Sequence, residues 1–304
     1  MNFSQIKKDL ETLDVGAMIE DEPMYKHTTY KVGGPARIYL KVKDIASLVK
    51  TIKYCKENDV DFMVIGRGSN LLISDREYEG IVISLNECFN QVEIKDNIIR
   101  AQAGALMINL AYQAAKEGLS GFEFMGGIPG SIGGGIYMNA GAYKYDIASV
   151  VKSVTLLDEN YQVVTYDKDQ MKFSYRHSIC QENRNLIVLE AQFEMTKKAP
   201  EEIRAVLDKR KARRMETQPW DKPSAGSVFR NPEDRPAWKY IDDCGLRGYE
   251  IGGASISSKH PNFIVNNGYA SAKDIYDLIM LVQTKVYEKF QIKFKREVEL
   301  VNWE

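Results

Sequence analysis

Two glycine-rich stretches contain the residues of this sequence that are best suited to binding chemistry. The first, GRGSN, covers residues 66–70; the second, GGIPGSIGGGIYMNAGAY, runs from Gly126 to Tyr143 and holds seven glycines among eighteen residues. Glycine adopts positive φ and lets another group approach the backbone closely. Backbone N–H groups that are exposed in this way bind phosphate. The two stretches therefore indicate a nucleotide whose diphosphate lies against the main chain.

The common nucleotide motifs do not account for these stretches. A Walker A loop needs GK followed by Ser or Thr, which the sequence lacks, and GRGSNL has no third glycine to complete a dinucleotide-binding GxGxxG. A P-loop or a simple Rossmann site is therefore disfavoured. Tight turns without a ligand stay open as an alternative, a weaker one for the longer stretch.

Hydrophobic periodicity predicts the elements that must position both stretches. Asp44 is a candidate N-cap, Gly118 a helix stop, Pro200 suits the first turn of a helix, and Ser271 with Asp274 resembles a capping box. Helices are expected at 44–59, 105–117, 200–217 and from 271 onward. Strands are expected at 62–66, 80–85, 98–104, 150–167 with a turn at 158–160, and 297–301. The first glycine stretch directly follows a strand, as ligand loops often do. The pattern indicates an α+β protein.

Composition and charge narrow the function classes. The 304 residues are 44% hydrophobic and 27% charged, as in an ordinary soluble globular protein. Lys and Arg total 41 against 42 Asp and Glu, so the net charge of -1 gives no overall attraction to nucleic acid or membranes. The basic run KRKARR at 209–214 is spread round a helix and is expected to be a solvated face. With no signal peptide or membrane-spanning stretch, the sequence predicts a cytoplasmic protein.

Metal and thiol chemistry are not indicated. The four cysteines are scattered, with no CxxC pair and no histidine at ligand spacing; they are Cys55, Cys88, Cys180 and Cys244. Reduced, inert thiols are expected.

Six motifs occur in the order found in one family. They are KVGGPA at 31–36, GRGSNLLISD at 66–75, GIPGSIGGGIYMNAGAY at 127–143, SYRHS at 174–178, SAGSVFRNP at 224–232 and KREVELV at 295–301. The chain resembles the UDP-N-acetylenolpyruvoylglucosamine reductase, or MurB, family over nearly its whole length, from about residue 20. It is similar to the shorter of the family's two forms, because residues 143–166 leave no room for the insertion whose tyrosine covers the substrate in the longer form.

The resemblance implies an FAD enzyme of peptidoglycan precursor synthesis. NADPH reduces the flavin, which then reduces the enolpyruvyl ether of UDP-N-acetylglucosamine to UDP-N-acetylmuramate. The implied fold is α+β, with a two-part FAD-binding region like that of the vanillyl-alcohol-oxidase superfamily (p-cresol methylhydroxylase-like) and a C-terminal α+β substrate-binding domain. The three parts are expected at 1–90, 91–200 and 201–304. Since GRGSN holds no His or Cys, the FAD is expected to be noncovalent.

Under this resemblance both glycine stretches become cofactor-binding segments. The residues expected to contact FAD are Gly66, Arg67, Gly68, Ser69, Asn70, Leu71, Gly127, Ile128, Pro129, Gly130, Ser131, Gly133, Gly134, Asn139, Ala140 and Gly141. The residues expected to contact the UDP-sugar are Tyr175, Gln218, Arg230 and Asn231. No metal is expected.

Three residues match the family's catalytic positions. Arg176, in SYRHS, is expected to stabilise the negative charge that develops at the substrate carboxylate as hydride arrives. Ser227, in SAGSVFRNP, matches the serine that protonates the carbon opposite the hydride. Glu297, in KREVELV, assists at the carboxylate and must be protonated or bridged by a cation, because two carboxylates repel each other. Ser224 and Glu299 are the nearest alternatives, and spacing alone does not choose between the two glutamates.

Without the resemblance, each of these residues has an ordinary interpretation as a surface arginine, a turn serine or an edge-strand glutamate. The histidines are interpreted as structural or positional: His27 lies near the flavin region, His260 in the substrate domain, and His177, on a strand, is expected to point away from Arg176. Two other functions stay open. Another flavin oxidoreductase of the same superfamily has no use for Ser227 as a proton donor, and a nucleotide-sugar-binding module without redox chemistry would be colourless.

Overall fold

The computed structural model describes residues 2–303, which form an α+β protein with two hydrophobic cores. The chain divides into two compact units and enters each of them three times. Unit 1 comprises Met1–Glu20, Ile38–Arg67 and Gly80–Ala212; unit 2 comprises Asp21–Arg37, Gly68–Glu79 and Arg213–Glu304. Each core belongs to one unit, so that the two units have separate interiors.

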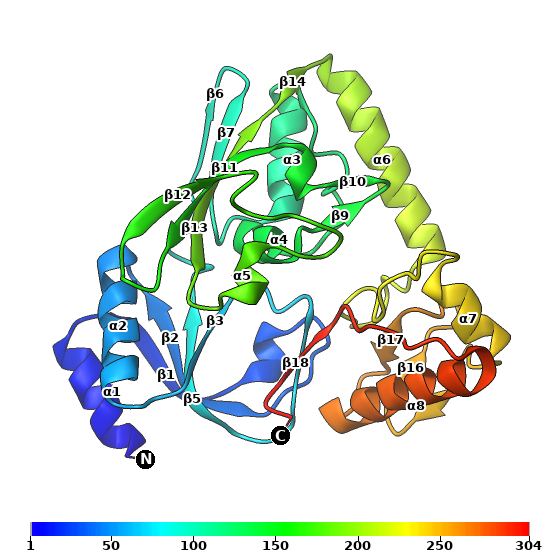
Figure 1. Ribbon diagram of the computed structural model, residues 1–304, viewed down its shortest axis with the longest axis horizontal. Helices are drawn as coiled ribbons and strands as arrows, with labels where there is room; N and C mark the ends of the chain where they lie inside the picture. The colour runs from blue at the N-terminus through cyan, green and yellow to red at the C-terminus, as the bar shows by residue number, and fades with distance from the viewer. Residues whose placement is uncertain (1, 304) are drawn as a thin grey trace. The chain divides into compact units, whose positions relative to one another are not determined.

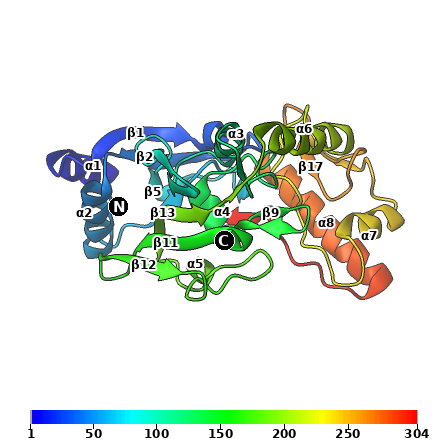
Figure 2. The same cartoon turned by 90° about the horizontal axis from the view of Figure 1, so that it is seen from above.

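An antiparallel sheet of five strands, in the order β12-β11-β13-β7-β6, forms the centre of unit 1. Its strands are β6 (Val92–Lys95), β7 (Ile98–Gln102), β11 (Val151–Leu157), β12 (Val163–Asp167) and β13 (Ile187–Glu194). Helix α4 (Ile132–Met138) packs against β13 and β7 (Figure 2). The second glycine stretch therefore runs into a helix that lies on this sheet.

A second sheet has four strands in the order β1-β2-β5-β3. They are β1 (Gly16–Pro23), β2 (Pro35–Val42), β3 (Phe62–Ile65) and β5 (Tyr78–Ser84). Strands β3 and β5 pair in parallel, with Phe62 opposite Ile81, and the first glycine stretch begins where β3 ends. Figure 1 labels the helices α1 (Phe3–Thr12) and α2 (Ile45–Glu57) near the N-terminus. They bury Ile6, Leu48 and Ile52 in the core of unit 1.

Short elements complete unit 1. They are α3 (Met107–Lys116), the paired strands β8 (Leu119–Ser120) and β14 (Thr196–Lys197), the hairpin of β9 (Gly141–Ala142) and β10 (Tyr145–Asp146), the 3-10 turn η2 (Ile147–Ser149) and α5 (Ile179–Glu182). Helix α6 (Pro200–Thr217) buries only Ile203 and Leu207 in the core, and the KRKARR run lies on it, half-buried or exposed.

Unit 2 packs two helices with a small sheet. Strands β15 (Glu250–Ile251), β16 (Ala254–Ile256) and β17 (Ile264–Asn266) pair in that order, and α7 (Ala237–Asp243) and α8 (Ala272–Phe290) contribute the buried helical faces. The 3-10 turn η1 (Met24–His27) also belongs to this unit. Strand β18 (Glu299–Val301) pairs in parallel with β4 (Leu71–Ile73), with Glu299 opposite Leu71. The end of the chain thus lies directly beside the residues that follow the first glycine stretch.

Several local predictions are confirmed. Asp44 caps α2 by accepting a hydrogen bond from the N–H of Ser47 at 2.7 Å, α6 begins at Pro200, and Ser271 and Asp274 form a capping box on α8. The expected final strand at 297–301 is shorter than predicted, because it starts at Glu299. The N–H of Glu297 instead donates to the carbonyl of Val228 at 2.8 Å.

The division into parts at 1–90, 91–200 and 201–304 stays a prediction. A division of the chain by its internal contacts separates units that each have a hydrophobic core of their own. It does not separate ligand-binding parts that share one core. Within residues 2–303, no helix is both long enough and apolar enough to cross a bilayer.

Asp75 connects the segment after β4 to the start of α8, and its removal is expected to destabilise unit 2. Its two carboxylate oxygens accept from the N–H groups of Ala272 and Lys273 at 2.8 and 3.0 Å. Asp75→Ala should lower the free energy of unfolding by about 1–2 kcal/mol, because two N-terminal donors of α8 lose their acceptor. Urea denaturation measures this change.

The matched control is Asp277→Asn on the same helix. Asp277 pairs with Lys273 at 2.6 Å, but the lysine side chain is 71% exposed, so the substitution should change the free energy of unfolding by less than about 0.5 kcal/mol. Equal effects of the two substitutions would contradict the capping role of Asp75.

Candidate functional site

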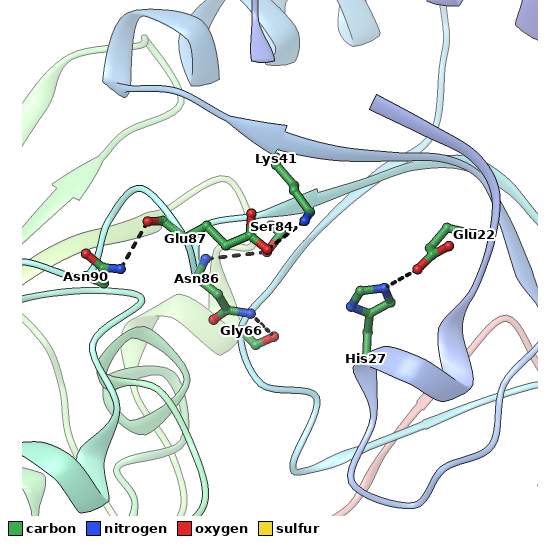
Figure 3. A network of polar contacts seen from close by, with 8 residues as sticks. All are labelled: Glu22, His27, Lys41, Gly66, Ser84, Asn86, Glu87 and Asn90. Carbon is green, nitrogen blue, oxygen red and sulfur yellow. Dashed lines mark hydrogen bonds and ion pairs between the residues drawn. The ribbon is translucent and has the colours of Figure 1, made fainter. Parts of the chain in front are cut away.

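The first glycine stretch begins at Gly66, which touches the second stretch. A Cβ at Gly66 would lie 2.3 Å from Oγ of Ser131, so only glycine fits here without movement. The side-chain amide of Asn86 donates to the carbonyl of Gly66 at 2.9 Å, and Figure 3 shows Asn86 reaching across to it. The N–H of Asn86 donates in turn to Oγ of Ser84 at 3.4 Å, while Lys41 forms an ion pair with Glu87 at 2.8 Å. The start of the loop is thereby held in place by the segment from Ser84 to Glu87.

Gly68 holds the middle of the same loop in a backbone conformation that other residues avoid. Its φ is +58°, and a Cβ there would lie 2.1 Å from the carbonyl oxygen of His27. Its own carbonyl accepts from the N–H of Thr29 at 3.3 Å. The η1 turn that carries His27 is fixed by a contact between its imidazole and the Glu22 carboxylate at 2.9 Å (Figure 3). Burial alone would raise the pKa of Glu22, but hydrogen bonds from His27 and Lys26 hold that pKa below its ordinary value.

The loop offers donors that the protein itself does not use. Within residues 2–303, the main-chain N–H groups from Arg67 to Asn70 donate to no acceptor of the protein, and Gly68 is buried. In unit 1, Oδ1 of Asn86, whose amide bonds Gly66, is buried without a hydrogen-bond partner among the described residues. In unit 2, Oγ1 of Thr29, whose N–H bonds Gly68, is buried and likewise without a described partner. Buried polar groups are nearly always paired in a complete complex. In each unit taken by itself, these unused groups fit part of a bound phosphate-containing cofactor such as FAD.

The second glycine stretch is connected to residues 103–107. The carbonyl of Gly130 accepts from the N–H of Met107 at 3.0 Å, and the N–H of Gly133 donates to the carbonyl of Ala103 at 2.7 Å. A Cβ at Gly133 would lie 3.0 Å from Cβ of Ala103, and one at Gly135 would lie 2.7 Å from Sδ of Met107. Some of these glycines therefore serve close packing as well as a ligand.

Arg176 lies at the tip of a tight turn, and the prediction that it and His177 lie on a strand is wrong. Ser174 and His177 exchange two main-chain hydrogen bonds of 3.1 Å, which leaves Tyr175 and Arg176 as the two turn residues. Arg176 has a φ of +56°, at a position that glycine or asparagine usually occupies. Its guanidinium donates to the carbonyl of Gly141 at 2.8 Å, so the side chain is directed toward the end of the second glycine stretch.

Ser227 is followed by an extended segment that is held on both sides. On one side the N–H of Phe229 donates to Oδ1 of Asn262 at 3.0 Å, and the Asn262 amide donates back to the carbonyl of Phe229 at 2.8 Å. On the other side the carbonyl of Val228 accepts from Glu297 N–H at 2.8 Å. The structure thus brings Ser227 and Glu297 onto neighbouring segments of unit 2.

Glu297 is also fixed to the first glycine stretch. The side-chain amide of Asn70 donates to the carbonyl of Glu297 at 2.9 Å, and the carbonyl of Asn70 accepts from the N–H of Glu299 at 2.9 Å. Glu297 and Glu299 are both half-buried, so burial does not distinguish them. The two glutamates differ in their contact with Val228, the residue after Ser227: of the two, it is Glu297 whose N–H donates to the carbonyl of Val228.

The residues expected to contact the substrate have mixed environments. Tyr175 is 51% exposed, with Arg176 over its ring at 5.1 Å, whereas Oδ1 of Asn231 accepts from the N–H that begins α7 at 3.0 Å. Oε1 of Gln218 accepts from Arg214 at 3.0 Å, and Nε of Arg230 is buried with no partner among the described residues. Tyr175 and Arg230 therefore present the groups that are best suited to a ligand.

Sequence reasoning missed two asparagines that shape the site, Asn86 and Asn262. Both form side-chain hydrogen bonds to main-chain groups far away in the sequence, which hydrophobic periodicity does not reveal.

The two buried thiols are in line with the expectation of inert groups: burial raises the pKa of Cys55 to about 12 and that of Cys180 to about 11. Burial lowers the pKa of His260, whose Nδ1 has no partner among the described residues.

Known proteins match the chain along its length. Residues 36–167 match the family model described as FAD binding domain, and residues 218–301 match UDP-N-acetylenolpyruvoylglucosamine reductase, C-terminal domain. UDP-N-acetylenolpyruvoylglucosamine reductase 1 of Bacillus anthracis is 44% identical over 299 residues, which cover 98% of this chain and 99% of that protein. The crystal structure of the Thermus caldophilus reductase aligns with a TM-score of 0.80 at 31% identity, over 94% of this chain and 98% of that one. The Physcomitrella patens BBE-like 1 structure, at 15% identity and a TM-score of 0.50, covers 62% of this chain and 44% of that one and shares the fold alone.

Gly68→Ala is expected to weaken FAD binding by about tenfold or more, because the added Cβ displaces the loop from the carbonyl of His27. Titration of the apoprotein with FAD, followed by flavin fluorescence, measures the dissociation constant. The matched control is Gly245→Ala, which has a φ of +70° but no described atom within 4 Å of its added Cβ. It should cost about 1–2 kcal/mol of stability and leave FAD affinity unchanged. A folded Gly68→Ala protein with normal FAD affinity would show that the loop does not hold the cofactor.

Proposed function

The chain belongs to the UDP-N-acetylenolpyruvoylglucosamine reductase family, and we propose that Arg176, Ser227 and Glu297 carry out its chemistry. The reaction is the NADPH-dependent reduction of UDP-N-acetylglucosamine enolpyruvate to UDP-N-acetylmuramate in peptidoglycan precursor synthesis. FAD, when bound, would supply the hydride chemistry between NADPH and the enolpyruvyl double bond. The protein must bind NADPH and the UDP-sugar in turn, stabilise the negative charge that develops on the substrate, and deliver one proton to it.

Arg176 is proposed to stabilise negative charge. The enol ether is electron-rich, so hydride addition succeeds only if the neighbouring carboxylate accepts the developing charge. A guanidinium stabilises such an extended enolate with paired N–H donors, and one well-placed donor is worth about 3 kcal/mol. The contact with Gly141 and the tight turn hold the Arg176 side chain in place before substrate binds, which reduces the reorganisation needed in the reaction.

Ser227 is proposed to donate the proton to the carbon opposite the hydride. A hydroxyl is a weak acid, so it must be aligned with a carbon that is becoming a carbanion. The alignment is supported by the segment that follows the serine, since Asn262 on one side and Glu297 on the other fix Val228 and Phe229.

Glu297 is proposed to assist at the substrate carboxylate, in its protonated form or across a bridging cation. The observation that carries this assignment is the hydrogen bond from Asn70 to the main chain of Glu297. It joins the loop proposed to hold FAD to the glutamate proposed to act beside it. Asn70 also bonds the main chain of Glu299, so the choice of Glu297 over Glu299 rests on the hydrogen bond from the N–H of Glu297 to the carbonyl of Val228, the residue after Ser227.

For the remaining residues the proposal follows the expectations from the sequence. The first loop from Gly66 to Leu71 and the second from Gly127 to Gly141 hold noncovalent FAD. The UDP-sugar contacts are assigned to Tyr175, Gln218, Arg230 and Asn231. A cytoplasmic location is proposed, because NADPH and UDP-sugars are made there.

Stepwise spectroscopy tests the function as a whole. The purified protein should be yellow, lose its flavin absorbance anaerobically with NADPH, and regain it with UDP-N-acetylglucosamine enolpyruvate. Loss of colour with no recovery would contradict the substrate, and a colourless protein that FAD does not reconstitute would support a nucleotide-sugar-binding module instead.

Ser227→Ala should separate the two half-reactions. Reduction of the flavin by NADPH should stay normal, whereas reoxidation by the enolpyruvyl substrate should slow by about 100-fold or more, because the general acid is gone. Rapid-mixing absorbance measures both rates, and Ser224→Ala is the matched control with both rates normal. Normal reoxidation of Ser227→Ala would refute the serine assignment.

A further inference from the structure

The side chain of Asn139 uses both of its N–H donors and its carbonyl oxygen in contacts with the protein, although it lies in the second glycine stretch. It is 1% exposed, and its amide donates to the main-chain carbonyl of Ser174 at 2.9 Å and to the carboxylate of Asp146 at 3.1 Å. Its Oδ1 accepts from the N–H of Ala148 at 3.0 Å. An asparagine side chain has two N–H donors and a carbonyl oxygen with two lone pairs; here both donors are used and Oδ1 accepts one hydrogen bond. A hydrogen bond donated by this amide to FAD would have to replace one of the two donor bonds.

Two of these contacts hold the surroundings of Arg176. Ser174 is the first residue of the turn that has Arg176 at its tip, so the hydrogen bond from Asn139 to the Ser174 carbonyl fixes the start of that turn. Asp146 lies in β10, opposite Gly141 in β9, and Gly141 is the residue whose carbonyl accepts from the Arg176 guanidinium. Asn139 therefore connects the turn that carries the Arg176 backbone with the β9–β10 hairpin, whose Gly141 carbonyl accepts from the Arg176 guanidinium.

The backbone at Asn139 supports the same interpretation. Asn139 is the C-cap of α4 with a φ of 41° and a ψ of 58°, in the left-handed region that asparagine tolerates better than most residues. Arg176 itself has a φ of +56°, and conformations of this kind persist only where the surrounding structure holds them. A loss of the Asn139 amide would release the turn that keeps Arg176 in this conformation.

We propose that Asn139 is a positioning residue for Arg176 and not a cofactor contact through its side chain. The proposal rests on the function of Arg176 stated above. Removing the amide should slow the step in which Arg176 acts, which is transfer to the enolpyruvyl substrate, and should leave FAD binding and reduction by NADPH unchanged.

Asn139→Gly tests the proposal, because glycine keeps the left-handed backbone and removes all three side-chain bonds. Flavin reoxidation by the substrate should slow by about 10- to 100-fold, while the dissociation constant of FAD and the rate of reduction by NADPH stay within about twofold of the parent. The affinity of the oxidised enzyme for UDP-N-acetylmuramate, measured by calorimetry, should fall as well. Asn139→Asp keeps the size and removes the donors, and it should act in the same direction.

Two further variants separate this proposal from the function on which it rests. In an Arg176→Ala background, Asn139→Gly should slow reoxidation no further, because a residue that acts through Arg176 has no effect once the arginine is gone. Gln291→Gly replaces the other helix C-cap of positive φ among the described residues and should leave every rate unchanged.

Several results would overturn the proposal. Normal reoxidation in Asn139→Gly together with slow reoxidation in Arg176→Ala would refute the role of Asn139 and leave that of Arg176 intact. Weaker FAD binding, with reoxidation restored by saturating FAD, would make Asn139 a cofactor residue. Loss of the folded state in both Asn139 variants would assign the residue to the fold alone. Normal reoxidation in Arg176→Ala would instead refute the proposed function of the arginine itself.

Discussion

The parallel pairing of β18 with β4 is the contact on which the arrangement of unit 2 depends. It places Glu299 opposite Leu71, immediately after the first glycine stretch, and Asn70 closes the pair by bonding the main chain of Glu297 and Glu299. Since the N–H of Glu297 is bonded to Val228, the same strand also fixes the segment that follows Ser227. A strand of three residues thus connects a cofactor loop, a proposed proton donor and a proposed glutamate through consecutive hydrogen bonds.

In unit 1 the corresponding constraint is backbone conformation. Asn139, Tyr143, Lys144 and Arg176 all have positive φ, and the first three lie in or just after the second glycine stretch. Tyr143 and Lys144 form the two-residue turn between β9 and β10, where Asn-Gly would be the usual choice. Such conformations are unfavourable for these residues and are maintained by the bonds from Asn139 and Arg176 to neighbouring main chain. The local strain coincides with the proposed catalytic arginine.

Local rules predicted much of the fold, because caps and periodicity are properties of neighbouring residues. Asp44, Pro200 and Ser271 each start a helix as expected, and the first glycine stretch follows the strand predicted before it. Helix α4, inside the second stretch, was not predicted. The turn at Arg176 was not predictable, since arginine has no preference for positive φ and the conformation is supported by tertiary bonds that involve Gly141, Ser174 and Gln181. The same holds for Asn262, whose bonds to Phe229 mimic a neighbouring strand. The catalytic residues themselves were found by resemblance and not by spacing.

The connection between Asn70 and Glu297 spans 227 residues of chain. A ribosome synthesises the chain from its N-terminus, so Tyr30, Val32 and Leu72 emerge long before the rest of the core in which they are buried. Contacts so distant in sequence form slowly, because a large loop must close before they are made. The early segments of unit 2 therefore lack their core partners until the residues from Ala225 to Val298 have been synthesised. A prematurely terminated chain lacks the strand that completes this unit, so incomplete synthesis yields a protein without an assembled site.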